Sequence, residues 1–535
     1  MTDPTLRIRA LLLTALILLS LFAGTAAAGT AVATPASSAD TPSDVPTIRE
    51  PVSMDTSSQL SVHADASDLP ASLLQSDSGV EVNLSASSTE VAQGGIATFT
   101  VQFNQSGSAA TVLIGNESED GYQANISVTD ANDDGVVTFA FNTYTAGDTA
   151  ADNIVQLVGD SESDRITFDS TESQTELDSL LDRGDYLVAV GTSDNPASVL
   201  DTPTFIGTLF ITERADSSQT LWRTTQETLS DVQEASDNET RSAVTTLGDA
   251  IEDERLTQTD RLAFTPNDSN SDVLVTRLTV PGLSGVLGSV SGGEVTDEFT
   301  AALQSTTTAE APLRVVLEEQ NPGLNREPVT LDIGEVLSTG PVIDDALTVI
   351  YVSDDTYFLF VEYDSVAASA FEETDSAFED DDEIAVNSSL QDTSLLDIDP
   401  NETDDTEIES QYQTASAIFT LEAAEGSFDQ NDDDLVTTTA EANATITGTT
   451  NVAPGTELTV VIRSGEEAQS PFIEAKTVTV STDGTFVATF DLSAQVPGDT
   501  FEVEVIQAPF STASEGVIVE ENTTEATAVG ISSMP

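Results

Sequence analysis

The sequence predicts a mostly β fold in which two Ig-like β-sandwich modules, residues 78–213 and 413–508, flank an α+β middle domain, residues 214–366. Two observations predict the sandwiches: short apolar runs, many with alternating polar residues, recur in both segments, and Gly, Asn and Asp separate these runs. A third observation predicts the middle domain, because its first part has the apolar period of amphipathic helices. The chain length of 535 residues suits about three domains of ~150 residues each.

The predicted strands of the first sandwich are short runs in which apolar residues alternate with polar ones or follow one another. Runs of this kind, bounded by turn residues, are typical of strands that cover a sandwich core. Seven runs fit this description: Val80–Leu84, Ile96–Phe103, Thr111–Ile114, Gln123–Thr129, Gly135–Asn142, Asp185–Val190 and Phe205–Ile211.

Three sequence markers occur in the same order in both predicted sandwiches, which indicates a repeated module. The first is a Val-Ala-x-Gly turn with a Thr four residues later, the second is Asp-Gly followed by five residues and Phe, and the third is a Gly-Asp pair that opens an apolar run. The pairs are Val91–Gly94 with Val452–Gly455, Asp134–Phe141 with Asp483–Phe490, and Gly184 with Gly498.

The middle segment combines a predicted helical hairpin with strands. Leu221, Thr225, Leu229 and Val232 share one helical face, and Ala243, Leu247 and Ile251 share another, with a break at residues 237–239 between the two. Trp222 is expected to anchor the core of this domain. Strands are then predicted at Val273–Val280, Leu313–Leu317, Leu347–Val352 and Tyr357–Tyr363.

The N-terminus predicts export. Arg7 and Arg9 precede the 13-residue apolar run Ala10–Phe22, and Ala26-Ala27-Ala28 fits an A-x-A cleavage site. This run is shorter than the ~20 residues that span a bilayer. We therefore expect residues 1–28 to be a signal peptide, with no membrane span after cleavage. An uncleaved anchor is the alternative.

Three segments lack a sustained apolar period. Residues 29–77, which contain the only histidine, His63, are expected to form a flexible linker. Residues 367–412 are expected to form an acidic linker, because a block of like charges is usually solvated. Residues 509–535 are expected to form a disordered tail.

The charge balance predicts adaptation to salt. The chain has 94 Asp and Glu against 15 Lys and Arg, a net charge of −79. In molar salt the Debye length falls to ~3 Å, so cations of the medium screen the repulsion between these carboxylates. Intrinsic disorder is the alternative, but 39% hydrophobic residues in periodic runs favour a folded chain. We expect no nucleic-acid partner, because phosphate binding needs clustered Lys and Arg.

One acidic turn has part of a metal-ligand pattern. Asp130, Asn132 and Asp134, followed by Gly135, have the spacing of the first half of a calcium loop, in which oxygen ligands surround a hard cation. The twelfth position is Phe141 instead of a bidentate Glu. The alternative is an Asp-Gly hairpin turn without metal. Calcium at this turn is the only cofactor that the sequence suggests.

Ten N-x-Ser/Thr sequons predict N-glycosylation of an exported chain, and this number is about twice what the composition gives by chance. The acceptor residues are Asn83, Asn104, Asn116, Asn125, Asn238, Asn267, Asn387, Asn401, Asn443 and Asn522.

Catalytic patterns are scarce. Gly282, Gly285 and Gly288 have the wrong spacing for a phosphate loop and no adjacent Lys or Arg. One histidine and no cysteine leave few residues for nucleophilic or zinc chemistry. We therefore expect a protein that is not an enzyme. The alternative is a secreted hydrolase that uses carboxylates of residues 214–366 to act on polysaccharide or peptide.

Three stretches resemble secreted cell-surface proteins of extremely halophilic archaea, of the surface glycoprotein type or with a BGTF surface domain. They are residues 121–147, the Gln320–Gly323 segment flanked by Arg314 and Arg326, and residues 448–490. The resemblance covers most of the mature chain. It implies an extracellular, cell-surface protein with a structural or adhesive role, including in a surface layer, and with cell-envelope proteins or surface glycans as partners.

Overall fold

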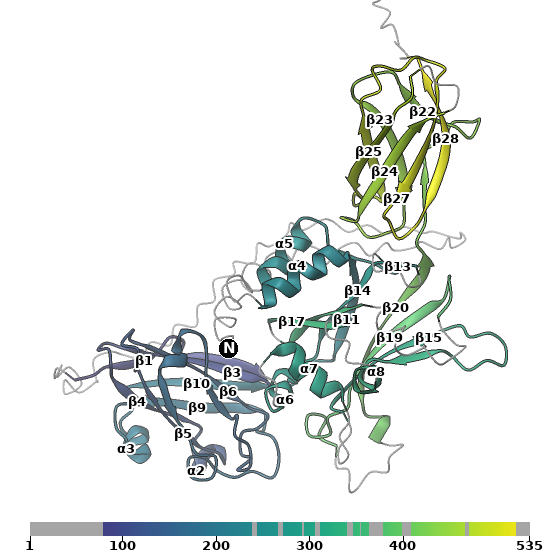
Figure 1. Ribbon diagram of the computed structural model, residues 1–535. Helices are drawn as coiled ribbons and strands as arrows, with labels where there is room; N and C mark the ends of the chain where they lie inside the picture. Colours follow the sequence, from purple (N-terminus) through teal and green to yellow (C-terminus); the bar gives the residue numbers. More distant parts are fainter. Residues whose placement is uncertain are drawn as a thin grey trace, which may run out of the picture.

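The computed structural model describes residues 79–237, 243–265, 271–290, 294–304, 311–339, 346–353, 355–362, 378–398, 408–465 and 470–520. These residues form three bodies in a row, a first sandwich, a middle domain and a second sandwich (Figure 1). The predicted mostly β fold is confirmed. The predicted signal peptide (1–28), linker (29–77) and His63 lie outside the described residues.

The first sandwich consists of two sheets with a shared core. Sheet I has the strand order β1-β3-β6-β7, and sheet II has the order β2-β10-β9-β4-β5-β8. The strands are β1 Val82–Leu84, β2 Ser88–Ala92, β3 Ile96–Phe103, β4 Ala109–Ile114, β5 Ala124–Thr129, β6 Val136–Asn142, β7 Val155–Leu157, β8 Arg165–Thr167, β9 Gly184–Gly191 and β10 Phe205–Thr212, and the helices are α2 Glu117–Asp120, η2 Gly159–Ser163 and α3 Pro196–Asp201.

The second sandwich has the same topology as the first without its insertions. Sheet V has the order β21-β23-β26 and sheet VI the order β22-β28-β27-β24-β25, which match sheets I and II once β7 and β8 are set aside. In both modules the second strand pairs in parallel with the last one. The strands are β21 Gly426–Phe428, β22 Val436–Thr439, β23 Ala444–Thr450, β24 Glu457–Ser464, β25 Ile473–Thr479, β26 Thr485–Phe490, β27 Thr500–Ile506 and β28 Thr512–Val519.

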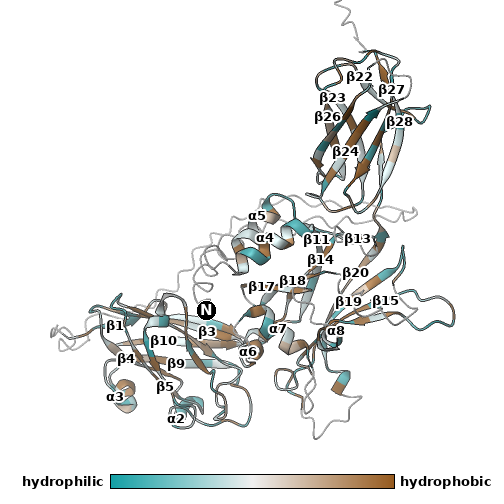
Figure 2. Ribbon diagram, viewed as in Figure 1, coloured by the Kyte–Doolittle hydropathy of each residue, from teal (hydrophilic) through white to brown (hydrophobic). Residues whose placement is uncertain are grey.

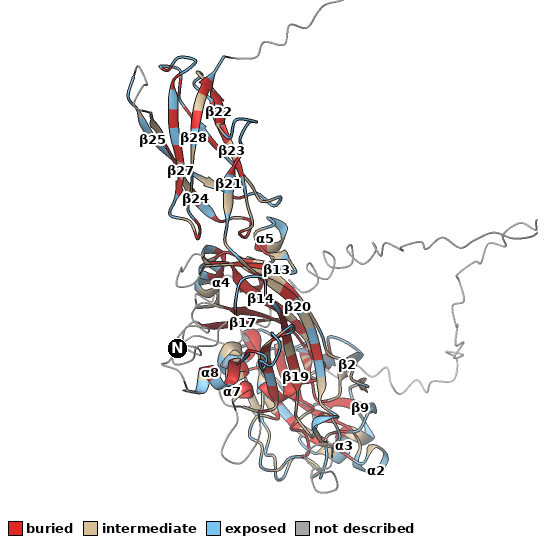
Figure 3. Cartoon of the chain, turned by 90° about the vertical axis from the view of Figure 1, so that its right-hand side faces the viewer, coloured by how far each residue is buried: buried red, intermediate tan, exposed pale blue. Residues whose placement is uncertain are grey.

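Alternating side chains fill each sandwich core, as the burial colours show (Figure 3). On β3, Phe99 and Val101 point inward, and the Phe99 ring lies 5.5 Å from that of Phe139 on β6. In the second module, Phe428 and Phe486 meet edge to face at 5.8 Å. Burial of such apolar surface stabilises the modules. In Figure 2, hydrophobic residues, drawn in brown, recur along the strands of both sandwiches.

Two of the three repeat markers lie at equivalent positions, and the first does not. The Asp-Gly marker precedes β6 in one module and β26 in the other, and the Gly-Asp marker lies at the start of β9 and just before β27. Val91–Gly94, however, joins β2 to β3, whereas Val452–Gly455 joins β23 to β24. Its match reflects shared turn chemistry, because Gly after a Pro or polar residue is favoured in type II turns wherever they occur.

The Asp-Gly turns do not connect neighbouring strands of one sheet. The interpretation of the Asp134-Gly135 turn as a hairpin turn is therefore wrong. The first connects β5 of sheet II to β6 of sheet I, and the second connects β25 of sheet VI to β26 of sheet V. Each turn thus carries the chain from one sheet to the other. The strands after the turns bury Phe141 and Phe490 in the two cores, which agrees with the expectation that these strands belong to the core.

The middle domain also has two packed sheets. Sheet III has the order β12-β11-β14-β18-β17, and sheet IV has the order β13-β20-β19-β15-β16. A single apolar cluster lies between them and includes Leu278, Phe299 and Phe419. The strands are β11 Ser218–Thr224, β12 Thr257–Gln258, β13 Arg261–Phe264, β14 Val273–Thr279, β15 Leu313–Glu319, β16 Thr330–Asp332, β17 Leu347–Ser353, β18 Thr356–Val361, β19 Glu383–Leu390 and β20 Gln413–Ala423.

Helices cover this domain. The predicted helical pair is present as α4 (Gln226–Asp237) and α5 (Ala243–Glu252), whose apolar residues pack on sheet III. Leu221 and Trp222 belong to β11 and not to a helix, because β-pairing with β14 overrides the local period. Trp222, which was expected to anchor the core, is partly buried and packs against the apolar cluster under α4 and α5, with its ring 6.2 Å from that of Phe358. The remaining helices are α6 Leu283–Leu287, α7 Val295–Leu303 and α8 Ile333–Thr339.

Two predicted boundaries are wrong. Residues 378–398 of the predicted acidic linker contain β19, whose neighbours in sheet IV are β15 and β20. The alternating apolar side chains of Ile384, Val386 and Leu390 are buried in the domain core, although acidic residues surround the strand in sequence. The middle domain therefore continues through β20, to Ala423. Likewise, β28 within the predicted tail is a full strand of the second sandwich. Within the described ranges, no helix is long and apolar enough to cross a membrane.

Candidate functional sites

The acidic turn before β6 is organised by one buried carboxylate. Asp130 is 1% exposed, and its Oδ2 accepts hydrogen bonds from the Gly107 and Gly135 backbone N–H groups, both at 2.9 Å. Its Oδ1 accepts from the Asp134 N–H at 3.2 Å. These backbone donors satisfy the charge of Asp130 and close the turn, which is a structural role that requires no metal.

The other two predicted ligands lie in the same turn but face local partners. Asn132 Oδ1 accepts from the Asp134 N–H at 2.9 Å, and Asp134 Oδ1 accepts from the Val136 N–H at 2.8 Å. Asp164, which the sequence did not single out, accepts from the backbone of Ala131 and Asn132. Within the described part of the chain, no three acidic or histidine side chains are grouped as metal ligands. Calcium binding here stays a prediction.

Six of the ten predicted sequons lie within the described residues. Asn83, Asn104 and Asn443 are exposed, whereas Asn116, Asn125 and Asn387 are half-buried. Asn116 caps α2 through Oδ1, and the Asn387 amide lies between Glu318 and Ser416. Asn238, Asn267, Asn401 and Asn522 lie outside the described residues.

The three glycines that resemble a phosphate loop lie at the joint between the first sandwich and the middle domain. A methyl group at Gly285 would overlap the carbonyl oxygen of Gly94, and one at Gly282 would lie 2.5 Å from the Gln93 carbonyl oxygen. Asn142 of β6 donates from Nδ2 to the Gly285 carbonyl at 2.9 Å. The spacing of these glycines therefore serves close backbone packing, and not phosphate binding.

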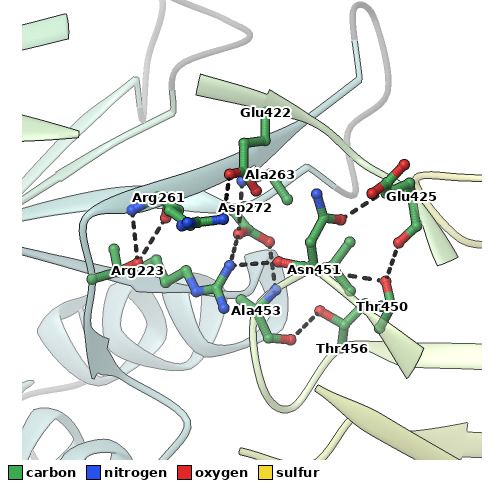
Figure 4. Close-up of polar contacts among 12 residues, drawn as sticks. Arg223, Arg261, Ala263, Asp272, Glu422, Glu425, Thr450, Asn451, Ala453 and Thr456 are labelled. Atoms are coloured by element: carbon green, nitrogen blue, oxygen red, sulfur yellow. Dashed lines mark hydrogen bonds and ion pairs between the residues drawn. The ribbon is translucent and has the colours of Figure 1, made fainter. Parts of the chain in front are cut away.

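A buried ion pair forms the centre of the second joint (Figure 4). Asp272 is 4% exposed, and its Oδ2 accepts from Arg223 Nη1 and from the Ala263 N–H, both at 3.1 Å. Its Oδ1 accepts from the Ala453 N–H of the second sandwich at 2.7 Å. Arg223 also donates to the Asn451 carbonyl at 2.6 Å. No local sequence pattern indicates this site, because the two ionic partners are 49 residues apart and neither belongs to a motif.

The environment of Asp272 opposes its ionisation. Burial raises its pKa to about 6, although the Arg223 guanidinium and the two backbone N–H donors lower the pKa. Burial thus outweighs the attraction of one guanidinium. An ion pair with this balance costs desolvation energy, and it positions the groups around it.

A cleft of about 600 Å³ lies beside this joint, between α4, α5 and the loops of the second sandwich. Its wall carries the Arg255 guanidinium among five carboxylates, those of Glu227, Asp231, Asp253, Glu254 and Glu457. Arg255 is 3.5 Å from Asp231 and 3.8 Å from Asp253. None of the residues that line this cleft is a histidine. Its charged side chains are mainly carboxylates, so the cleft is an acidic surface.

Comparisons with known proteins agree with the resemblance. Residues 75–193 match the family described as "Domain of unknown function (DUF7827)". A "Cell surface glycoprotein" of Haloferax gibbonsii is 33% identical over 77% of this chain and 41% of its own length. "Cell surface glycoprotein 2" of Haloarcula hispanica is 29% identical over 80% of this chain and 44% of its own length. The chain thus spans less than half the length of these curated relatives.

Among solved structures, the tetra-tandem repeat in the extending region of a large adhesion protein is 13% identical and matches over 82% of this chain and 74% of that one. Its TM-score of 0.16 is too low to equate the two architectures. The two sequence relatives, in contrast, align over 413 and 448 residues, which correspond to 77% and 80% of this chain. The chain is therefore a homologue of haloarchaeal cell surface glycoproteins over most of its length, and it is a protein of the cell surface.

Proposed function

We propose that the chain is a salt-adapted, N-glycosylated structural or adhesive component of the archaeal cell envelope, without enzymatic activity. The observation that carries this proposal is the similarity to surface glycoproteins across about four-fifths of the chain. The architecture supports it, because two sandwiches in a row with the middle domain between them suit a spacer at a surface. Its partners would be other envelope proteins or surface glycans.

Fractionation of the native cells tests the proposed location and role. We expect the protein in washed envelopes, with no hydrolysis of polysaccharides or peptides by the purified protein in high salt. A cytosolic protein of the same cells serves as the control for leakage. Recovery of the protein mainly from the cytosol, or turnover of a substrate, would contradict the proposal.

Salt adaptation is tested by unfolding at several NaCl concentrations. The net charge of −79 predicts a steep loss of stability as salt falls from molar to millimolar, because fewer counterions screen the carboxylates. Sucrose at equal osmolality controls for non-ionic solute effects. A transition midpoint that does not move with NaCl would refute salt adaptation.

Glycosylation is proposed first at Asn83 and Asn443. Both are exposed, and within the part of the chain that the structure describes neither side chain takes part in a hydrogen bond, so their amides are accessible there. Asn116 and Asn387, in contrast, already use their side-chain oxygens locally. Peptide mapping of the native protein, with Asn83→Gln and Asn443→Gln as matched variants, measures occupancy. Unmodified Asn83 and Asn443 beside modified Asn387 would reverse this order.

A further inference from the structure

We propose that a Val-Ala-x-Gly turn docks each sandwich on the middle domain, and that these two turns fix the orientation of the three bodies. We name residues 91–95 the first docking turn and residues 452–456 the second docking turn. The middle domain then contacts each sandwich at a separate site. We name the site around Gly285 and Leu395 the first socket and the site around Arg223 and Asp272 the second socket. The inference concerns the joints alone, so it stands or falls independently of the proposed envelope role.

The two docking turns have the same backbone geometry. Gly95 N–H donates to the Ala92 carbonyl at 2.9 Å, and Thr456 N–H donates to the Ala453 carbonyl at 3.2 Å. Within these hydrogen-bonded four-residue turns, 92–95 and 453–456, the third residue is a glycine with positive φ, +84° at Gly94 and +89° at Gly455. A positive φ at this position alone defines a type II turn, which favours Gly there.

The first socket holds its turn through close backbone packing. Gly94 lies against Leu395 of the middle domain, and its carbonyl lies against Gly285 of α6. The buried Asp355 carboxylate holds the start of α6 in place, because it accepts from the N–H groups of Gly282 at 2.7 Å and Ser284 at 2.8 Å. Arg214, in the connection between β10 and β11, donates to the Pro281 carbonyl at 2.6 Å.

The second socket holds its turn through charge. The Asp272 carboxylate accepts from the Ala453 N–H, and Arg223 donates to the Asn451 carbonyl just before the turn. Asn451 in addition bridges the connecting strand, since its Nδ2 donates to the Ala423 carbonyl at 2.8 Å and its Oδ1 accepts from the Glu425 N–H at 2.9 Å. All these groups converge in Figure 4.

The positions of the two turns argue that docking, and not the module repeat, accounts for them. The first docking turn joins the second and third strands of its sandwich, whereas the second joins the third and fourth. An inherited turn would occupy the same loop in both modules. The first sandwich joins its third and fourth strands through residues 104–108, and the second joins its second and third strands through residues 440–443. Both loops are largely exposed and lack the Val-Ala-x-Gly sequence. In each module the turn occurs at the end that faces the middle domain (Figure 1).

Spin-label distances in the full chain test the proposal, and the absence of cysteine makes the labelling specific. Thr167→Cys on β8, Ser230→Cys on α4 and Thr489→Cys on β26 replace exposed residues, one in each body. The pair 167–230 reports on the first joint and the pair 230–489 on the second. In molar salt we expect one narrow distance distribution for each pair.

Each socket is then broken separately. Gly285→Ala should broaden the 167–230 distribution and leave 230–489 unchanged, and Asp272→Ala should do the reverse. Gly323→Ala is the matched control, because nothing lies within 4 Å of the added methyl group. If either variant fails to fold, Leu395→Ala and Asn451→Ala loosen the first and second sockets more mildly.

Three results would overturn the inference. Broad distributions in the unmodified background would mean that the turns do not fix the orientation. Narrow, unshifted distributions in all socket variants would mean that other contacts do so. Broadening of both pairs by a single socket variant would show that the two joints are not separate docking sites.

Discussion

The two joints of the molecule hold similar turns by different physics. At the first joint, glycines let two backbones touch, and the amide of Asn142 adds a neutral hydrogen bond. At the second joint, a buried carboxylate and guanidinium hold the turn. Close packing is sensitive to volume and insensitive to pH, whereas a buried ion pair is sensitive to the loss of either partner. The comparison therefore predicts different responses to substitution.

The largest effect is expected for Asp272→Ala, at the second joint. The substitution leaves the partly buried Arg223 charge and two backbone N–H groups without their acceptor, and loss of one partner of a buried pair costs about 3 kcal/mol or more. Denaturant unfolding in molar salt measures the change. Asp185→Ala, at an exposed position on β9, is the control. A cost as small as that of the control would mean that the pair does not hold the joint.

A smaller effect is expected for Gly285→Ala at the first joint. The added methyl group overlaps the Gly94 carbonyl, and overpacking of this kind costs about 1–3 kcal/mol. The same unfolding measurement applies, with Gly323→Ala as the control for the intrinsic effect of alanine. If Gly285→Ala and Gly323→Ala were equally stable, close packing at Gly285 would not contribute to the stability of the first joint.

The pH dependence of the second joint should follow from Asp272. Its pKa of about 6 in the folded chain exceeds the ~3.9 of an unfolded Asp. The folded state therefore binds this proton more tightly, and the stability contributed by Asp272 rises as the pH falls through 6. Between pH 7 and pH 5 the gap between the unmodified chain and Asp272→Ala should widen by about 1 kcal/mol.

Parallel unfolding of the two proteins at several pH values isolates this contribution, because the other carboxylates titrate in both. A gap that narrows at pH 5 would mean that Arg223 lowers the pKa more than burial raises it. Gly285→Ala serves as the comparison for the first joint, where the same gap should stay constant over this range.

The smallest effect is expected for Arg183→Ala. Arg183 and Glu213 are 2.9 Å apart, but their side chains are 55% and 79% exposed. Exposed pairs contribute about 0–1 kcal/mol, and molar salt screens them further. A loss above ~1 kcal/mol in the same assay would show that exposed pairs matter in this protein as much as the buried one.

Much of the fold was predictable, because strand alternation is a local signal. The predicted Ile96–Phe103 strand agrees with β3 in both bounds, and the helical pair was found from its apolar faces. The prediction failed where pairing partners decide the outcome. Leu221 fits a helical face but pairs in a sheet, and β19 was concealed by its acidic surroundings. The acidic turn was located correctly, but its carboxylates have backbone partners that no spacing reveals.

The sequence by itself determined the composition of the surface, the apolar period of the strands and the sequons, since each of these depends on residue type and local order. Only the tertiary structure decided that Gly282, Gly285 and Gly288 face another module, and that Asp272 meets Arg223 and Ala453. Contacts between residues far apart in the chain depend on how the sheets pack and where their ends meet. That information belongs to the whole fold, so no single stretch of sequence contains it.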